Sequence, residues 1–302
     1  MTQRIDGLIA AVFTPFKPDG SLHLAPIEPY ADLLVRNGVH AVFVCGTTGE
    51  SASLSLAERK AVVEHWVATA GRRLTIIVHV GHNALPDACD LARHAQKAGA
   101  HAIGSLAPSF FKPGLEPLVG YCAAVAAAAP ERPFYYYHIP SMTGVNVPVA
   151  AFLEQAADRI PTLAGAKFTY EDLMDLQRAM RVRGGRYQLL FGRDETLLAG
   201  LALGCTGAVG TTYNYDAPLY QRVIAAFAKR DFEAARREQH RAAERIGAMV
   251  RAGGLPAAKA LMARLGMDCG PVRLPLAPPS PPALDAYFRE LDALGFDDGR
   301  CR

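Results

Sequence analysis

Lys167 is the residue whose place in the sequence most favours covalent chemistry. It ends the apolar run from Leu163 to Ala166, which is typical of a buried strand. Burial penalises the charged ammonium and favours the free amine, the form of lysine that attacks a ketone to make an imine. The alternative is a lysine at a strand end whose stem packs while its ammonium reaches water.

Tyr137 could assist such an imine. It lies near the end of the run from Phe134 to His138, which we expect to be the strand next to that of Lys167. Because adjacent strands lie only about 4.8 Å apart, the phenol would reach a substrate bound to the lysine and could transfer a proton. The alternative is a core aromatic side chain with a satisfied hydroxyl.

The segment Gly46-Thr47-Thr48-Gly49-Glu50 offers two hydroxyls and free backbone N–H groups near the start of a helix. Such a turn suits a small carboxylate. A tight turn between glycines, with a threonine as helix cap, is the alternative.

The acidic pair Asp194 and Glu195 also has two possible roles. The carboxylates could bind a polyol, or they could cap the following helix.

Other reactive residue types are weaker candidates. His79 and His82 lack a clear third ligand, so we expect no metal site. Cys45 lies in an apolar run, where a buried thiol is the commoner case than a nucleophile.

The elements that would position these residues alternate between short β-branched or aromatic runs and longer amphipathic runs, which is typical of βα units. Eight units precede a change of pattern and favour a closed (β/α)8 TIM barrel over an open sheet. In such a barrel the active site lies at the carboxyl ends of the strands. The expected strands are Leu8–Phe13, Ala41–Cys45, Leu74–Val80, Ala102–Leu106, Phe134–His138, Leu163–Phe168, Tyr187–Phe191 and Gly207–Gly210.

The chain after the eighth unit has a purely helical pattern from Ala217 to about Leu265, followed by a proline-rich hinge and a last helix. We therefore expect residues 1–216 to supply the strands and most helices of the barrel. Residues 217–302 would form the last barrel helix and a C-terminal helical appendage, continuous with the barrel.

Composition excludes several classes of protein. The 302 residues carry a net charge of +3 without a block of like charge, so neither nucleic acid nor an anionic membrane is an expected partner. The six cysteines are widely spaced, which suits a reducing cytoplasm. Asp6 and Gly7 interrupt the segment from Met1 to Ile9, where a signal peptide would need an apolar core.

The order of these motifs resembles the dihydrodipicolinate synthase and N-acetylneuraminate lyase superfamily over nearly the whole chain. The shared features are the Gly-Thr-Thr-Gly-Glu turn, a Tyr-x-x-Pro turn at Tyr137, the strand-end Lys167 and the later Gly-x-Asp-Glu segment. The segments Phe134–Val145, Phe191–Glu195, Gly207–Tyr215 and Gly270–Leu276 are most similar to the N-acetylneuraminate lyases.

The resemblance implies a role for each site residue. Lys167 would form the Schiff base, Tyr137 would transfer protons with Thr47 as a relay, and Thr47 and Thr48 would hold the carboxylate of pyruvate. The residues that would contact the sugar portion are Thr169, Gly192, Asp194, Glu195 and Thr211.

The resemblance also implies an activity: a class I lyase that cleaves N-acetylneuraminate to N-acetylmannosamine and pyruvate, without a metal or cofactor, as a homotetramer. Dihydrodipicolinate synthase, or another 2-oxo acid aldolase or dehydratase, is the alternative. The synthases typically carry an arginine where this chain has Met142. A ligand sensor without catalysis is a third hypothesis, which the intact lysine, tyrosine and threonines disfavour.

Overall fold

A computed structural model describes residues 4–302, and its centre is a closed barrel of eight parallel strands in sequential order. The predicted barrel is therefore confirmed. Residues 1–3 lie outside the described residues. They include the start of the expected barrel unit and part of the segment in which we expect no signal peptide. The strands are β1 (Gly7–Ala11), β2 (Ala41–Val44), β3 (Thr75–His79), β4 (Ala102–Leu106), β5 (Phe134–His138), β6 (Leu163–Phe168), β7 (Gln188–Phe191) and β8 (Gly207–Gly210).

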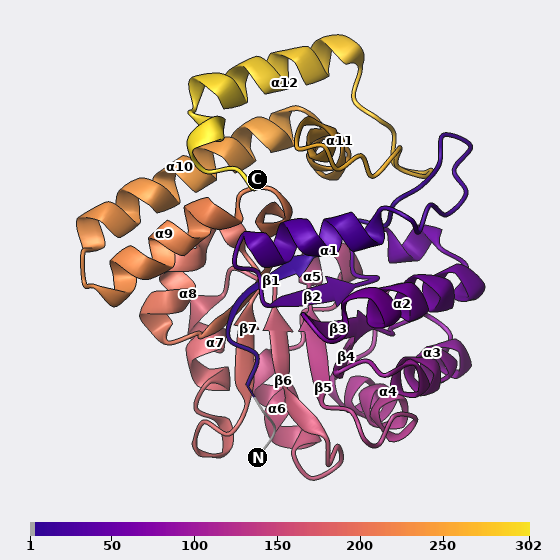
Figure 1. Ribbon diagram of the computed structural model, residues 1–302. Coiled ribbons are helices and arrows are strands. Elements are labelled where there is room, and N and C mark those ends of the chain that lie inside the picture. The colour runs from indigo at the N-terminus through magenta and orange to yellow at the C-terminus, as the bar shows by residue number, and fades with distance from the viewer. Residues whose placement is uncertain (1–3) are drawn as a thin grey trace.

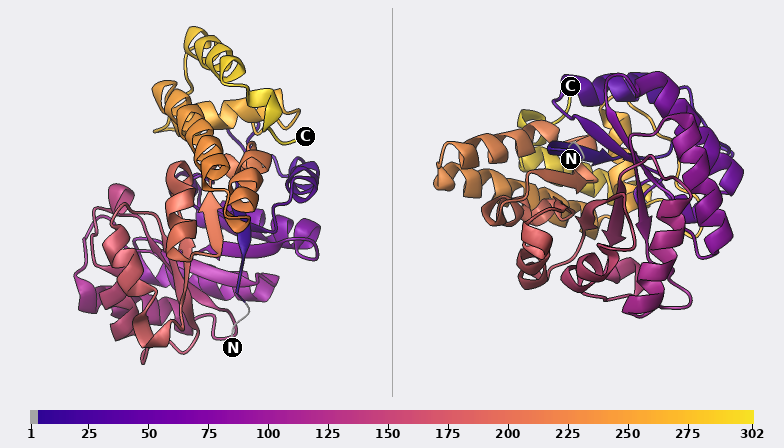
Figure 2. Two further views of the ribbon diagram at one scale, coloured as in Figure 1. Left: turned by 90° about the vertical axis from the view of Figure 1, so that its left-hand side faces the viewer. Right: turned by 90° about the horizontal axis from the view of Figure 1, so that it is seen from below.

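Helices follow the strands around the barrel and cover its outside (Figure 1; Figure 2, right). They are α1 (Ile27–Arg36), α2 (Leu56–Ala70), α3 (Leu85–Ala98), α4 (Leu115–Ala127), α5 (Pro140–Thr143), α6 (Val149–Ala156), α7 (Leu173–Ala179), α8 (Leu197–Leu203) and α9 (Ala217–Ala228). None of the helices within residues 4–302 combines the length and the hydropathy that a membrane span requires.

Alternation along each strand separates two cores. In β5, Tyr135 and Tyr137 point into the barrel, while Phe134 and Tyr136 pack with the residues under the surrounding helices. This is the expected period of two, because successive side chains of a strand point to opposite faces. The last inward side chain of a strand therefore lies at the carboxyl-end mouth of the barrel, and in β5 this side chain is Tyr137.

Three further helices form a separate layer beyond the carboxyl ends of the strands: α10 (Phe232–Arg251), α11 (Leu255–Arg264) and α12 (Pro281–Ala293). Figure 1 shows this layer at the end of the barrel opposite the N-terminus, and the left view of Figure 2 shows it from the side. The predicted C-terminal helices are confirmed. Their position over the strand ends brings them next to the expected site.

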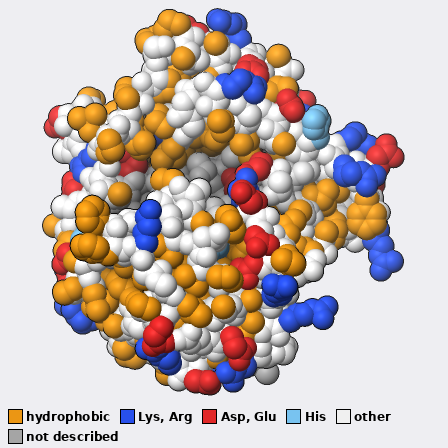
Figure 3. Space-filling model, turned by 180° about the vertical axis from the view of Figure 1, so that it is seen from behind, with side chains coloured by type: hydrophobic (Ala, Val, Ile, Leu, Met, Phe, Trp, Pro, Cys, Tyr) orange, Lys and Arg blue, Asp and Glu red, His pale blue; other side chains and the backbone are white. Residues whose placement is uncertain are grey.

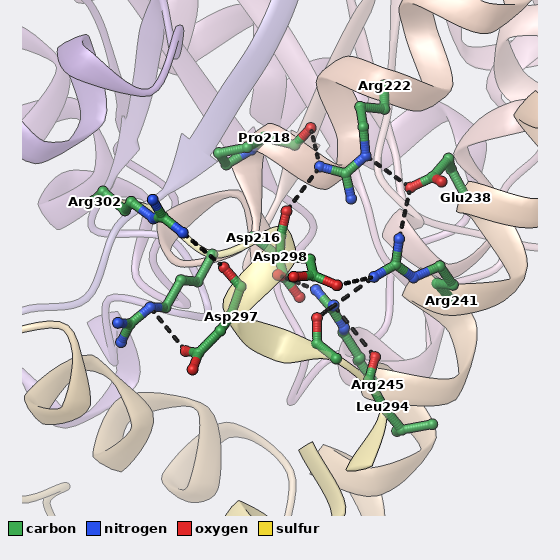
Figure 4. Close-up of polar contacts among 12 residues, drawn as sticks. Asp216, Pro218, Arg222, Glu238, Arg241, Arg245, Leu294, Asp297, Asp298 and Arg302 are labelled. Carbon is green, nitrogen blue, oxygen red and sulfur yellow. Dashed lines mark hydrogen bonds and ion pairs between the residues drawn. The ribbon is translucent and has the colours of Figure 1, made fainter. Parts of the chain in front are cut away.

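Two ion pairs, one of them fully buried, join this layer to the barrel (Figure 4). Arg245 of α10 donates to Asp216, just before α9, over 2.6 Å, and their side chains are 2% and 3% exposed. Arg222 of α9 pairs with Glu238 of α10 over 2.8 Å. Because a buried charge is tolerated only when it is paired, removing one partner of the Asp216–Arg245 pair would strongly destabilise this contact.

Candidate active site

Lys167 is the second-last residue of β6, near the carboxyl end of the predicted strand, and its side chain is buried at 4% exposure. Strand register places it directly beside Tyr137 of β5. The Nζ atom lies 4.0 Å from the centre of the Tyr137 ring and 4.3 Å from the centre of the Phe43 ring. The amine is thus enclosed by aromatic faces at the mouth of the barrel, an environment in which a covalent imine is protected from bulk water.

The hydroxyl of Tyr137 lies 3.2 Å from Oγ1 of Thr47, within hydrogen-bonding distance. Thr48 makes a similar contact of 2.7 Å with Thr211 at the end of β8. Tyr137 is held from the side by edge contacts with the rings of Phe43 and His79, at 5.4 and 5.8 Å between centres. The tyrosine and the threonine that we expected to act together therefore do meet, next to the lysine.

The turn after β2 presents backbone donors as well as hydroxyls. Within residues 4–302, the N–H groups of Thr47 and Thr48 have no hydrogen-bond acceptor. Thr14 donates its hydroxyl to the carbonyl oxygen of Gly49 over 2.7 Å, which fixes the far side of the turn. Two free N–H groups beside two hydroxyls form a suitable cradle for a carboxylate.

Asp194 follows β7 by three residues and is buried at 6% exposure. Its Oδ2 accepts from the backbone N–H and the hydroxyl of Thr212, over 2.9 and 2.6 Å. It therefore binds the segment that follows β8 and does not cap its own helix. Desolvation raises the pKa of Asp194 to about 6, although the two hydrogen bonds from Thr212 oppose this shift.

Glycines allow this close packing at two points. A Cβ atom on Gly210 would lie 2.2 Å from Oδ1 of Asp194, and one on Gly192 would lie 2.1 Å from Oγ1 of Thr169. Both contacts are far shorter than a Cβ atom makes, so a side chain at either position would displace Asp194 or Thr169. The hydroxyl of Thr169 is buried without a hydrogen-bond partner in the described chain, so it is available to a ligand.

These side chains line one cavity of about 220 Å³. Every predicted site residue lines it except Glu195, which instead pairs with Arg193 over 2.8 Å at partial exposure. A hollow between the barrel and the C-terminal layer opens on the face shown in Figure 3. The structure therefore brings the predicted site residues together around one cavity, apart from this one acid.

Met249 of α10 and Leu255 at the start of α11 also line the cavity. Neither residue was predicted to line the site, because the last helices were expected to form an appendage. No local pattern marks them: each is an apolar residue on a helix, and only the docking of the C-terminal layer brings it over the strand ends.

The weaker candidates have structural partners. Nδ1 of His79 donates to the carbonyl oxygen of Cys45 over 2.9 Å, and burial lowers the histidine's pKa well below its usual value. Burial raises the pKa of the Cys45 thiol to about 11, which suits the expected inert thiol. Within residues 4–302, no three His, Cys, Asp or Glu side chains are grouped closely enough to hold a metal ion.

Comparison with known proteins gives a consistent result. The model of the dihydrodipicolinate synthetase family matches residues 4–293. The N-acetylneuraminate lyase of Gallus gallus is 41% identical over 303 residues, which cover 98% of this chain and 98% of that protein. The solved N-acetylneuraminate lyase of Proteus mirabilis is 40% identical with a TM-score of 0.95, and the match covers 97% of this chain and 100% of that one. A dihydrodipicolinate synthase from Aquifex aeolicus is 27% identical with a TM-score of 0.90, covering 97% and 99% of the two chains.

Proposed function

The chain belongs to the dihydrodipicolinate synthetase family, and from this premise we propose that it is a Schiff-base lyase that cleaves N-acetylneuraminate to N-acetylmannosamine and pyruvate. Its 41% identity to an N-acetylneuraminate lyase over 98% of the chain supports this substrate. The observation that carries the chemistry is the buried amine of Lys167 beside the Tyr137 and Thr47 hydroxyls.

The first step is formation of the imine. The free amine of Lys167 attacks the C2 ketone of the open-chain sugar acid, and the hydroxyl of the resulting carbinolamine leaves as water. The protonated imine that remains attracts electrons from the neighbouring carbon–carbon bond. The lysine thus supplies the electrophilic activation that other aldolases obtain from a metal ion. This mechanism needs no diffusible cofactor.

The second step breaks the bond between C3 and C4. Tyr137, with Thr47 as relay over their 3.2 Å contact, accepts the proton of the C4 hydroxyl. The electrons of the broken bond move into the imine and form an enamine, while C4 becomes the aldehyde of N-acetylmannosamine. Tyr137 returns the proton to C3, and water then hydrolyses the imine to release pyruvate and the free lysine.

The two ends of the substrate would contact different parts of the cavity lining. We place the pyruvate carboxylate on the free N–H groups and hydroxyls of Thr47 and Thr48. The sugar portion would extend toward Thr169, Gly192, Asp194 and Thr211, with Glu195 at the edge of this wall. The resemblance further implies a homotetramer in the cytoplasm.

The test is covalent trapping. Incubation with pyruvate and borohydride should add one reduced pyruvate to the peptide that contains Lys167, because borohydride reduces the imine to a stable amine. Lys167→Met should abolish the label, and the wild-type protein should release pyruvate from N-acetylneuraminate. A wild-type protein that gains no mass, or that carries the label on a different lysine, would contradict the proposal.

The alternative function is condensation of pyruvate with aspartate semialdehyde. Met142 is 62% exposed and has no charge with which to bind the carboxylate of that aldehyde. Losing a charge-assisted hydrogen bond typically costs about 1.5–3 kcal/mol, or roughly ten- to a hundred-fold in efficiency. Efficient formation of dihydrodipicolinate would favour the alternative.

A further inference from the structure

The turn that would hold the pyruvate carboxylate is strained at both ends. Cys45 and Glu50 flank it, and both adopt left-handed backbone conformations, with φ of 56° and 55°. Residues other than glycine rarely adopt this conformation unless the surrounding contacts hold them in it. Cys45 is held through its carbonyl oxygen, which accepts from His79 over 2.9 Å. Glu50, at the other end of the turn, must likewise be held by surrounding contacts.

Glu50 supplies that anchor with its own side chain. The carboxylate is fully buried, and its Oε1 accepts from Nζ of Lys259 over 2.6 Å. Its Oε2 accepts from the backbone N–H of Arg273 over 2.8 Å. Both oxygens are thus bound by the C-terminal part of the chain, while the backbone N–H of Glu50 closes the turn on the carbonyl oxygen of Thr47 over 3.0 Å.

Lys259 connects this anchor to the wall of the cavity. Its side chain is 1% exposed, and its Nζ lies 4.1 Å from the centre of the Phe16 ring. It follows Leu255 by four positions on α11, so the two side chains share one face of the helix. Leu255 lines the cavity. One helix face therefore bears both an apolar wall of the site and the cation that binds the turn.

We propose that the buried Glu50–Lys259 pair is a positioning pair, which holds the Thr47–Thr48 turn in the strained conformation that binds the pyruvate carboxylate. This proposal rests on the proposed function, since it assigns that carboxylate to the turn. Neither side chain lines the cavity. Their effect on binding is therefore indirect, through the backbone of the turn.

A purely structural role predicts a different outcome. Removing one partner leaves an unpaired buried charge, which destabilises any fold, whereas removing both charges restores much of the stability. If the pair only balances charge, the double variant Glu50→Gln/Lys259→Met should bind pyruvate like the wild-type protein. If the pair positions the turn, the double variant should regain thermal stability and still bind pyruvate weakly.

The measurement is the pyruvate concentration that gives half-maximal borohydride trapping on Lys167, together with the maximal extent of labelling. For Glu50→Gln, for Lys259→Met and for the double variant, we expect this concentration to rise at least about ten-fold. Labelling at saturating pyruvate should remain complete, because the lysine itself is untouched. Should the single variants fail to fold, the double variant, in which neither charge remains buried, carries the test alone.

Asp216 and Arg245 provide a matched control. This pair has the same 2.6 Å contact and similar burial, and it also joins the strand ends to the C-terminal layer, but it does not contact the turn. Asp216→Asn/Arg245→Met should leave half-maximal trapping unchanged. Wild-type binding by the Glu50→Gln/Lys259→Met variant, or an equal shift in the control, would overturn the proposal. Absence of label in the wild-type protein would instead refute the proposed function on which it rests.

Discussion

The inner and outer halves of the cavity are built by different means. The inner half, formed by Thr47, Thr48, Tyr137 and Lys167, consists of hydroxyls, free N–H groups and an amine enclosed by aromatic rings. The outer half is formed by Thr169, Gly192, Asp194 and Thr211, together with Met249 and Leu255 from the C-terminal layer. The inner half contains what imine chemistry requires. The outer half contains what could distinguish one sugar acid from another, which is where members of one fold usually differ.

Tyr137 belongs to the inner half but does not form the covalent bond. Its hydroxyl can therefore be tested separately from imine formation. Tyr137→Phe keeps the ring against Lys167 and removes the hydroxyl that contacts Thr47. We expect cleavage of N-acetylneuraminate to fall about 10²- to 10⁴-fold, the usual contribution of general acid–base catalysis. Trapping of pyruvate on Lys167 should persist.

Tyr135→Phe is the matched control for this prediction. Tyr135 points into the barrel two residues earlier, and its hydroxyl donates to Gln188 over 3.1 Å, away from the cavity. This change should cost some stability and leave cleavage nearly unchanged. Equal losses of activity in the two variants, measured as kcat/KM, would mean that Tyr137 acts through packing alone.

Asp194 tests the outer half. Its Oδ1 accepts no hydrogen bond from residues 4–302, whereas Oδ2 is occupied by Thr212, so one oxygen is left for a sugar hydroxyl. Asp194→Asn retains the shape and removes the charge. Cleavage should fall at least about ten-fold, the factor that corresponds to 1.4 kcal/mol. Pyruvate trapping should be unaffected, and a parallel loss of trapping would show that the two halves are not separable.

The raised pKa of Asp194 adds a pH dependence to this prediction. With a pKa of about 6, the side chain is ionised above that pH and becomes protonated as the pH falls through it. Since the ionised form is the better acceptor, kcat/KM for N-acetylneuraminate should decline below about pH 6 in the wild-type protein. Asp194→Asn should lose this acidic decline, because nothing titrates at that position. A profile that is the same in both proteins would assign the decline to another group.

The sequence was most informative where the site depends on strand order. The expected strands agree with the observed ones to within two residues, and β4, β5, β6 and β8 agree at both ends. Tyr137 and Lys167 could be placed side by side because consecutive strands of a barrel are neighbours. Register then brought them into direct contact.

The contribution of the C-terminal layer could not be predicted in the same way. Glu50 and Lys259 are 209 positions apart, and neither residue belongs to a local pattern that would pair them. Met249 and Leu255 reach the cavity only because α10 and α11 dock over the strand ends. Docking of this kind depends on buried ion pairs and packing between distant segments, which helical periodicity does not encode.

Glu195 defines the edge of the outer half, and we expect the smallest effect there. It does not line the cavity, and its carboxylate pairs with Arg193 over 2.8 Å, with side-chain exposures of 34% and 31%. Exposed ion pairs contribute about 0.2–1 kcal/mol, so Glu195→Gln should lower cleavage by less than about five-fold if the pair is its main role. Arg193→Gln breaks the same pair and provides the comparison. Equal kcat/KM values for the two variants would show that Glu195 acts only through its ion pair with Arg193. A clearly larger loss in Glu195→Gln would show that the carboxylate contacts the sugar portion directly and would extend the outer half to include it.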